Sequence, residues 1–458
     1  MAAAKYKADN LTALLDNNQF QQTGPVSEVM PALFPIAEKW RAFGWHAVAV
    51  DGHDLQSILA ALDEARGTKG RPTMIVARTI KGKGISFVEG KGGWHGRPLK
   101  KGEEFDRAIA ELESQLVPES DSVPPPSPPS TVQRPVPRRV PPAPPSYARG
   151  DSVATRQAFG AALARLGDAD DRIVALDADV KNSTFSEVFE QRHPDRFYQA
   201  FIAEQAMLGA AMGLAARGAV PFASTFAAFL TRAADFVRMA AISNLNVKLA
   251  GSHAGVSIGE DGPSQMALED LAMMRAQPNI TVLYPCDAVS TERLVEQMAR
   301  QPGLAYIRTS RPKTPVIYGP DDSFEFGGLK VLRQSPNDEA TVIGAGVTVF
   351  EALKAFDELL ERGISIRVVD LYSLQPIDGA SLIRCARETH GRLITVEDHY
   401  AAGGVGDAVA ASVASAGFTV RRLAVEEIPR SGTPEQLMDH SGISSRHIIA
   451  AVTESRVA

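Results

Sequence analysis

The sequence predicts an α/β protein made of three consecutive parallel-sheet units, of which the first is incomplete. Short apolar strands alternate with helical patterns along most of the chain, which is typical of parallel sheets covered by helices. The chain has 458 residues, and a domain holds roughly 150. Its 44% hydrophobic content is enough for several cores and excludes a fully disordered chain.

The first unit is predicted to span residues 1–116. A helix is expected to begin after Asp54, whose carboxyl caps it, and Leu55, Ile58, Leu59 and Leu62 recur on one face. A parallel sheet is normally wide and buried on both faces, so three strands make this unit look incomplete. The strands are expected at residues 11–16, 46–50 and 73–78, and a further helix at 35–43.

A proline-rich linker is predicted at residues 117–148. The segment from Val117 to Tyr147 holds 12 of the 30 prolines. Proline lacks the backbone donor and fixes φ, so such a segment is extended and serves as a spacer. The alternative is a docking site for a proline-recognition domain.

Two further α/β units follow, at residues 149–326 and 327–458. In the first of these we expect helices at 155–166 and 206–216, and strands at 173–176, 247–250, 281–284 and 305–308. In the second we expect a helix at 350–361 ended by Gly363, and strands at 341–344, 364–370 and 393–396.

Composition excludes several classes of protein. Forty-eight basic and 54 acidic residues leave a net charge of −6, which predicts no general affinity for nucleic acid. Two cysteines in so long a chain argue against a disulfide scaffold and fit a reducing compartment. No apolar run reaches the roughly 18 residues that span a bilayer, and no secretory signal is seen. We therefore expect a cytoplasmic protein that binds neither membrane nor nucleic acid.

Two motifs of the second unit can carry chemistry. In FIAEQ, Glu204 follows a short apolar strand and precedes a helix of small residues, so its carboxyl would lie in a poorly hydrated pocket; the alternative is a helix cap. Phe226 and Phe229 are three residues apart and would share one face of a helix. They form either part of an aromatic core or a flat wall for a heteroaromatic ring.

The polar segment GSHAGVSIGEDGPSQ, residues 251–265, is predicted to be a functional loop. Its His253 and Asp261 can hydrogen-bond a polyhydroxylated substrate. Arginine forks match phosphate oxygens, although a surface position is the commoner role of any one arginine. The candidates near predicted element ends are Arg156, Ser183, Arg308 and Arg311, and Asp177 ends a strand at the edge where α/β sheets bind ligands.

Two motifs of the first unit give weaker signals. DNNQF, residues 16–20, ends a strand with oxygen-bearing side chains that suit a hard metal such as Mg²⁺. KGKGISFVEGKGGWH is a basic, glycine-rich loop with Lys81, Lys83 and His95, which can approach a phosphate but matches no nucleotide-loop pattern.

Taken together and in this order, these segments resemble the transketolase family. The resemblance runs from about Tyr6 to the C-terminus, interrupted only by the proline-rich linker, and includes LDNN, ARTIKGKGISFVEGKGGWHGRPL, FIAEQAM, STFAAFLTRAADFVRMAAIS, GSHAGVSIGEDGPSQMALEDLAM and TVEDHY. The family implies thiamine diphosphate with Mg²⁺ or Ca²⁺. It also implies transfer of a two-carbon ketol unit between sugar phosphates such as xylulose 5-phosphate and ribose 5-phosphate, in a homodimer.

The resemblance assigns a role to each matching residue. Glu204 corresponds to the glutamate that hydrogen-bonds the pyrimidine N1′ and, with His95 and His253, is a catalytic candidate. The cofactor-binding set is Glu204, Phe226, Phe229, Lys81, His95 and Gln265. The substrate-binding set is Arg156, Ser183, His253, Asp261 and Arg311. The metal ligands are the side chain of Asn18 and the backbone carbonyl of Phe20.

The chain also departs from the family, whose first domain carries a further segment before the equivalent of Tyr6. That segment includes a Gly-Asp-Gly motif whose aspartate binds the metal, and no such motif precedes Asp16 here. Three accounts follow: a truncated transketolase, which we favour; one part of a split enzyme completed by an N-terminal polypeptide; or a non-catalytic relative that binds partners. A deoxyxylulose-phosphate synthase-like enzyme is the nearest alternative activity. We expect the chain alone to have little or no activity.

Overall fold

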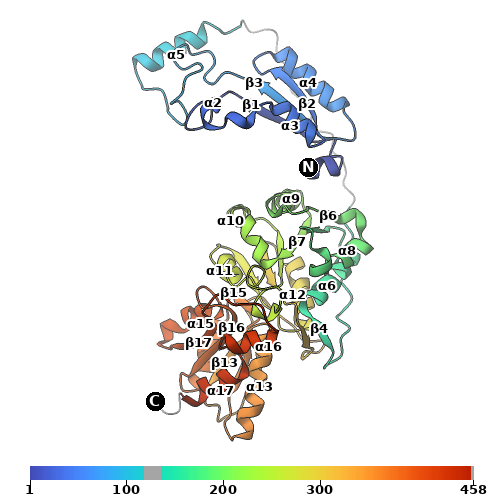
Figure 1. The fold of residues 1–458 in the computed structure, drawn as a ribbon, viewed down its shortest axis with the longest axis vertical. Coiled ribbons are helices and arrows are strands. Elements are labelled where there is room, and N and C mark those ends of the chain that lie inside the picture. Colours follow the sequence, from blue (N-terminus) through green and yellow to red (C-terminus); the bar gives the residue numbers. More distant parts are fainter. Residues whose placement is uncertain (118–135, 455–458) are drawn as a thin grey trace. The chain divides into compact units, whose positions relative to one another are not determined.

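A computed structural model describes residues 1–117 and 136–454 and divides the chain into two compact units, residues 1–133 and 134–458. Most of the predicted linker, residues 118–135, lies outside the described residues. Both units are α/β with mostly parallel strand pairing, as the sequence predicts (Figure 1). Each is described by itself.

The first unit contains, among its described residues, a three-stranded parallel sheet in the order β1-β3-β2. All three strands were predicted, to within a residue or so at either end. A small cluster centred on Trp45 and Met74 forms its core. The strands are β1 (Thr12–Asn17), β2 (His46–Asp51) and β3 (Thr73–Arg78), and the helices are α1 (Ala2–Lys5), α2 (Val26–Val29), α3 (Ile36–Ala42), α4 (Leu55–Gly67) and α5 (Glu103–Glu113).

The predicted start of α4 is confirmed, because the Asp54 carboxylate accepts hydrogen bonds from the backbone N–H groups of Gln56 and Ser57. The buried side of the helix differs from the leucine-rich face that the sequence indicated. Leu55 and Leu59 are 73% and 61% exposed, whereas Ala61 and Ala65 are buried. A sheet of three strands buries only a narrow strip of the helix, and the larger apolar side chains stay uncovered within the described part of this unit.

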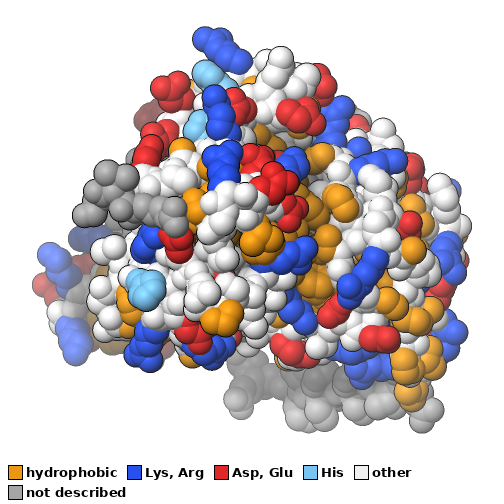
Figure 2. All heavy atoms as spheres, turned by 90° about the horizontal axis from the view of Figure 1, so that it is seen from below, with side chains coloured by type: hydrophobic (Ala, Val, Ile, Leu, Met, Phe, Trp, Pro, Cys, Tyr) orange, Lys and Arg blue, Asp and Glu red, His pale blue; other side chains and the backbone are white. Residues whose placement is uncertain are grey.

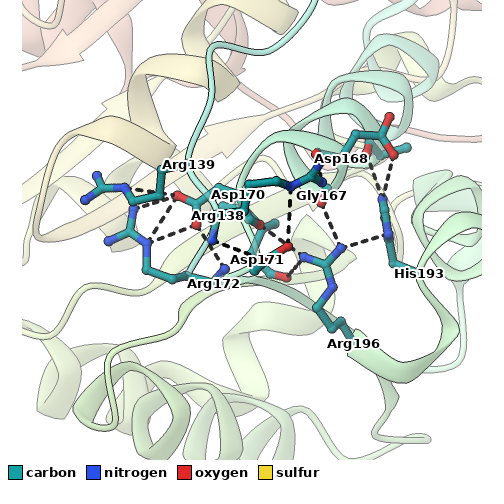
Figure 3. A network of polar contacts seen from close by, with 11 residues as sticks. Arg138, Arg139, Gly167, Asp168, Asp170, Asp171, Arg172, His193 and Arg196 are labelled. Carbon is teal, nitrogen blue, oxygen red and sulfur yellow. Dashed lines mark hydrogen bonds and ion pairs between the residues drawn. The ribbon is translucent and has the colours of Figure 1, made fainter. Parts of the chain in front are cut away.

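The described end of the predicted linker belongs to the second unit. Residues 136–148 are mostly extended, and Val140 donates its N–H to the carbonyl of Ala169. Arg138 donates its backbone N–H to the Asp171 carboxylate, within the network of arginines and aspartates in Figure 3. Tyr147 donates its hydroxyl to Glu292 at 2.6 Å. This stretch is therefore attached along the unit by specific bonds.

The first sheet of the second unit has seven strands among the described residues, in the order β15-β9-β10-β8-β7-β5-β6. Most of their residues are buried, as expected for a parallel sheet covered on both faces. The strands are β5 (Ile173–Asp177), β6 (Phe197–Gln199), β7 (Val220–Phe226), β8 (Lys248–Ser252), β9 (Ile280–Leu283), β10 (Leu304–Arg308) and β15 (Ser373–Gln375). The helices are α6 (Thr155–Ala169), α7 (Lys181–Thr184), α8 (Glu187–Arg192), α9 (Glu204–Ala216), α10 (Ala234–Ile242), α11 (Asp270–Arg275) and α12 (Ala288–Arg300), with a two-stranded ribbon of β4 (Ser152–Ala154) and β11 (Lys313–Pro315).

The second sheet has five strands in the part of the chain that the structure describes, in the order β12-β14-β13-β16-β17. Its strands are β12 (Lys330–Arg333), β13 (Thr341–Gly344), β14 (Arg367–Asp370), β16 (Leu393–Tyr400) and β17 (Val420–Val425). Its helices are α13 (Thr348–Glu361), α14 (Gly379–Glu388), α15 (Val405–Val413), α16 (Pro434–His440) and α17 (Ser445–Glu454). The intervening β15 leaves this sheet and pairs antiparallel with β9 of the other.

The surface and the thiols agree with the composition. Basic and acidic side chains are interspersed over the face in Figure 2. Cys286 and Cys385 are free and buried. Across residues 1–117 and 136–454, every helix is too short or too polar to cross a membrane.

Candidate functional site

The candidate residues of the second unit gather where strands of the seven-stranded sheet end. Phe226 is the last residue of β7, and His253 directly follows β8. Glu204 is the first residue of α9, which begins after the short β6. The carboxyl ends of parallel strands meet at one edge of a sheet, and this edge is where α/β sheets bind ligands.

Glu204 is buried and paired. Its side chain is only 3% exposed, and its carboxylate accepts a hydrogen bond from Arg232 at 2.5 Å. Glu204 therefore forms an ion pair at the site. The sequence left open that this residue only caps a helix, and the ion pair goes beyond that role. The pairing with Arg232 was not predicted, although the motif STFAAFLTR contains that arginine.

Aromatic and cationic groups lie beside this carboxylate. The Phe226 and Phe229 rings stack at 5.2 Å between centroids, and His253 stacks on Phe226 at 4.0 Å. The guanidinium of Arg232 lies 4.4 Å from the centre of the Phe229 ring. The expectation that both phenylalanines share a helix is wrong, because Phe226 ends a strand and Phe229 lies in the 3₁₀ helix η3 (Ala227–Ala233).

His253 is a neutral, oriented imidazole. It is 3% exposed, and its Nε2 lies 3.3 Å from Nη1 of Arg156 while its Nδ1 lies 2.9 Å from the Ser252 hydroxyl. Burial, together with the charges of Arg156 and Arg311, lowers the pKa of His253 to about 3. Because arginine can only donate, Nε2 is the acceptor and the proton resides on Nδ1.

The low pKa of His253 predicts a pH effect on stability. The unfolded chain protonates this residue near its ordinary pKa of 6.5 and the folded chain only near 3, so His253 makes stability fall as the pH falls through that range. We expect His253→Asn, which suits the residue's positive φ of 59°, to gain stability relative to the unmodified protein between pH 7 and 4. Urea titrations at several pH values measure this.

His390→Asn is the matched control, because His390 is exposed and also has a positive φ, of 55°. It should track the unmodified protein at every pH. A His253→Asn profile parallel to that of the unmodified protein would show that His253 takes up its proton in the folded state as easily as in the unfolded one.

Two arginines and the 251–265 loop form a polar cluster beside His253. Arg156 donates to the backbone carbonyl of Ser183 at 3.0 Å, and the nearby charge of Arg311 is one cause, after burial, of a lowered Arg156 pKa. Arg311 lies 3.3 Å from the Asp261 carboxylate and donates to the Ile258 carbonyl. Four of the five predicted substrate residues are thus linked by contacts or charge, and Ser183 joins through its backbone.

Gln265 lies near the end of the same loop. Its amide oxygen accepts a hydrogen bond from the Ser264 hydroxyl at 2.5 Å.

Arg308 and Asp177 are structural, which corrects their prediction as ligand-binding candidates. Arg308 is fully buried and is held by Asp270 at 3.0 Å and by two backbone carbonyls, so no phosphate can reach it. Asp177 is also fully buried and accepts hydrogen bonds from Thr184, Ser186 and the Val180 N–H. Burial raises its pKa to about 6. It holds the turn that carries Ser183.

The metal candidates of the first unit do not form a complete site. Asn18 donates to the Asp16 carboxylate and accepts from the Phe20 N–H, both at 2.9 Å, so its amide closes a local turn. Within the described residues, no three histidine, cysteine, aspartate or glutamate side chains are arranged to hold a metal ion. Asn18 and the Phe20 carbonyl are two neutral ligands, and neither supplies the carboxylate by which proteins usually bind Mg²⁺.

The basic loop of the first unit is largely exposed. The Lys81 carbonyl accepts from the Gly90 N–H, and Lys83 pairs with Glu89 at 3.2 Å. His95 is exposed. These side chains can meet an anion from solvent.

A buried carboxylate beside stacked phenylalanine rings provides one acceptor and a flat apolar wall. An aminopyrimidine needs both, because its ring stacks and its edge hydrogen-bonds.

Comparisons with known proteins agree with this geometry. Residues 1–115 match the family described as transketolase, thiamine diphosphate binding domain, residues 151–316 the transketolase pyrimidine binding domain, and residues 329–448 the transketolase C-terminal domain. The chain is 48% identical over 452 residues to the transketolase of Homo sapiens, covering 98% of this chain and 72% of that protein. It is 50% identical over 455 residues to transketolase-like protein 1 of Bos taurus, covering 98% and 76%.

Solved structures give the same result. A structure titled split gene transketolase, inactive beta4 tetramer, is 39% identical with a TM-score of 0.61 and covers 66% of this chain and 98% of its own. The transketolase mutant R525L from Pichia stipitis has a TM-score of 0.80 over 99% of this chain and 72% of its own, and at 22% identity it shows the shared fold. The chain therefore belongs to the transketolase family, as its motifs indicated.

Proposed function

We propose that this protein is a thiamine diphosphate-dependent transferase that moves a two-carbon ketol unit from a ketose phosphate to an aldose phosphate. Xylulose 5-phosphate and ribose 5-phosphate are the proposed substrates, which places the reaction in the pentose phosphate pathway and in the cytoplasm. The observation that carries the proposal is Glu204, a carboxylate 3% exposed beside the stacked Phe226 and Phe229 rings. Membership of the family supports it.

Glu204 would hold the pyrimidine edge of the cofactor by sharing one proton with N1′, with Phe226 and Phe229 as the wall. Thiamine diphosphate supplies the electron sink of the reaction when bound. Glu204 would hold or release a proton at that ring nitrogen, which is the general acid–base role of one buried carboxyl group. His253, held neutral with its proton on Nδ1, would contact the sugar.

Arg156 and Arg311 would bind the phosphate of the sugar, with Ser183, Asp261 and Gln265 beside it. The charge of Arg311 is one cause, after burial, of the lowered Arg156 pKa, and an anion bound between the two guanidinium groups would stabilise both. Asp261 is 35% exposed and can read a hydroxyl group of the sugar.

A change at Arg311 tests the phosphate assignment. We expect Arg311→Leu to raise the KM for xylulose 5-phosphate by about tenfold or more, since a charge-assisted hydrogen bond is lost, with a smaller effect on kcat. Steady-state kinetics measure it, and the KM for unphosphorylated xylulose should stay unchanged. Arg149→Leu is the control, because Arg149 is 73% exposed and its nearest carboxylate is 4.0 Å away. Equal losses for both sugars would contradict a phosphate role.

We assign Lys81 and His95 to the diphosphate, and Asn18 and the Phe20 carbonyl to Mg²⁺ or Ca²⁺. Because these two ligands are neutral, we propose that the chain by itself turns over slowly and that an N-terminal polypeptide with a further carboxylate ligand would raise its activity. We also propose a homodimer. The exposed apolar side chains near α9 and on α10, Ile202, Met239 and Ile242, support it.

Titration of the purified protein with thiamine diphosphate and Mg²⁺ tests the proposal. Calorimetric binding together with turnover of xylulose and ribose 5-phosphates supports the transferase, and binding without turnover supports a slow chain that needs a partner. Turnover of pyruvate with a triose phosphate would instead indicate the deoxyxylulose-phosphate synthase-like alternative. No binding at millimolar cofactor would leave the non-catalytic account.

A further inference from the structure

We propose that Arg232 is a gate of the cofactor site: its guanidinium lies where the aminopyrimidine would bind and must move away before thiamine diphosphate binds. This inference rests on the proposed function, because it assigns Glu204 and Phe229 to the cofactor. Its new element is Arg232, a residue of this chain that competes with the cofactor for Glu204 and for Phe229.

The contacts of Arg232 duplicate those expected of the cofactor ring. Its Nη1 donates to the Glu204 carboxylate at 2.5 Å, and its guanidinium lies 4.4 Å from the centre of the Phe229 ring. A guanidinium is planar, stacks on aromatic faces and presents N–H donors at its edge. An aminopyrimidine protonated at N1′ and stacked on Phe229 would donate to the same acceptor and use the same ring.

The aromatic stack leaves little room for both groups. Four side chains stack in a series, in the order His253, Phe226, Phe229 and Arg232. The Phe226 ring centre lies 4.0 Å from that of His253 and 5.2 Å from that of Phe229. Arg232 is the member of this series with an exposed side chain, at 49%, whereas His253 is 3% exposed. Displacing Arg232 into water is therefore the easier way to free a ring.

The burial of Glu204 explains why such a gate is useful. A carboxylate that is 3% exposed is strongly destabilising when it has no partner. Arg232 supplies that partner in the empty protein, and the pyrimidine edge supplies it after binding. The Glu204 carboxylate therefore has a hydrogen-bond donor both with and without the cofactor. The apparent affinity for the cofactor is lower as a result, because only those molecules in which Arg232 is displaced can bind it.

Cofactor titration of two variants tests the gate. Arg232→Met keeps the length of the side chain but removes its charge and donors, and Arg232→Lys restores the charge without the planar fork. At fixed excess Mg²⁺, we expect Arg232→Met to bind thiamine diphosphate about tenfold more tightly than the unmodified protein, with Arg232→Lys between the two. Arg192→Met is the control, since Arg192 is 51% exposed in an ion pair with Asp168 elsewhere in the same unit.

Thermal unfolding gives a second readout that does not depend on turnover. Without cofactor, Arg232→Met should melt lower than the unmodified protein because Glu204 is uncompensated, and thiamine diphosphate should raise its Tm by more. If the unmodified protein binds the cofactor and Arg232→Met binds it equally or less tightly, the gate is wrong while the proposed function stands. If neither protein binds it, both are wrong.

Discussion

Replacing Glu204 with glutamine should slow proton removal at the reacting carbon of bound thiamine diphosphate by about 100-fold or more, since a positioned acid or base commonly contributes 10²–10⁴. The amide has almost the same shape as the carboxylate, so the packing around residue 204 should keep its form. It cannot carry the negative charge that now holds Arg232 at 2.5 Å. Deuterium exchange at the thiazolium C2, measured by NMR after acid quench, reports the rate directly and requires no sugar turnover.

Glu358→Gln is the matched control for this experiment. It makes the same carboxylate-to-amide change on α13, where Glu358 is 51% exposed and 3.6 Å from Arg362. Its exchange rate should equal that of the unmodified protein. A Glu204→Gln protein that binds the cofactor and exchanges C2 at the unmodified rate would contradict the role given to this carboxylate.

Arg308→Met should destabilise the second unit by about 3–5 kcal/mol, the usual cost of removing one partner of a buried ion pair. Arg308 and Asp270 are 0% and 1% exposed, and they lie 3.0 Å apart. Without the guanidinium, the Asp270 carboxylate keeps the hydroxyl of Tyr306 and the His399 ring, whose Nε2 lies 3.8 Å away, and stays buried. Urea unfolding followed by far-UV circular dichroism measures the change.

A double variant separates loss of the pair from loss of packing. Arg308→Met combined with Asp270→Leu removes both charges and should recover much of the loss, because apolar replacements of buried pairs are often well tolerated. Arg421→Met is the surface control, since Arg421 and its partner Glu454 are 44% and 64% exposed and such pairs contribute about 1 kcal/mol or less. A single variant as stable as this control would show that Asp270 does not depend on Arg308.

Apolar periodicity predicted the α/β class and most strands, since buried strands such as β5 and β13 are short apolar runs. The strands it missed have other patterns. β7 reads VPFASTF, with a proline and polar residues, and β17 carries two arginines on an outer strand. β15 has only three residues, and its pairing with β9 depends on a return of the chain that no local pattern records.

The site could be predicted residue by residue, but its contacts could not. Family motifs pointed to Glu204, Phe226 and His253, which the structure brings to one edge of a sheet. Motifs also made Arg308 look like Arg311, because Arg308 ends β10 and Arg311 lies three residues beyond it, and only burial distinguishes them. The ion pair of Arg232 with Glu204 joins residues 28 positions apart, and no spacing rule anticipates it.

The position of β15 has a consequence for how this protein can be divided. Its residues Ser373 and Gln375 close the outer side of the sheet that carries Glu204 and His253, although they come from the stretch that otherwise builds the C-terminal domain. A protease cut or stop codon between residues 327 and 372 would strip that sheet of its border strand and leave β9 with unsatisfied amides, open to pairing with other chains. The two domains of the second unit should therefore unfold and refold together, in a single cooperative step. They should not be expressed separately.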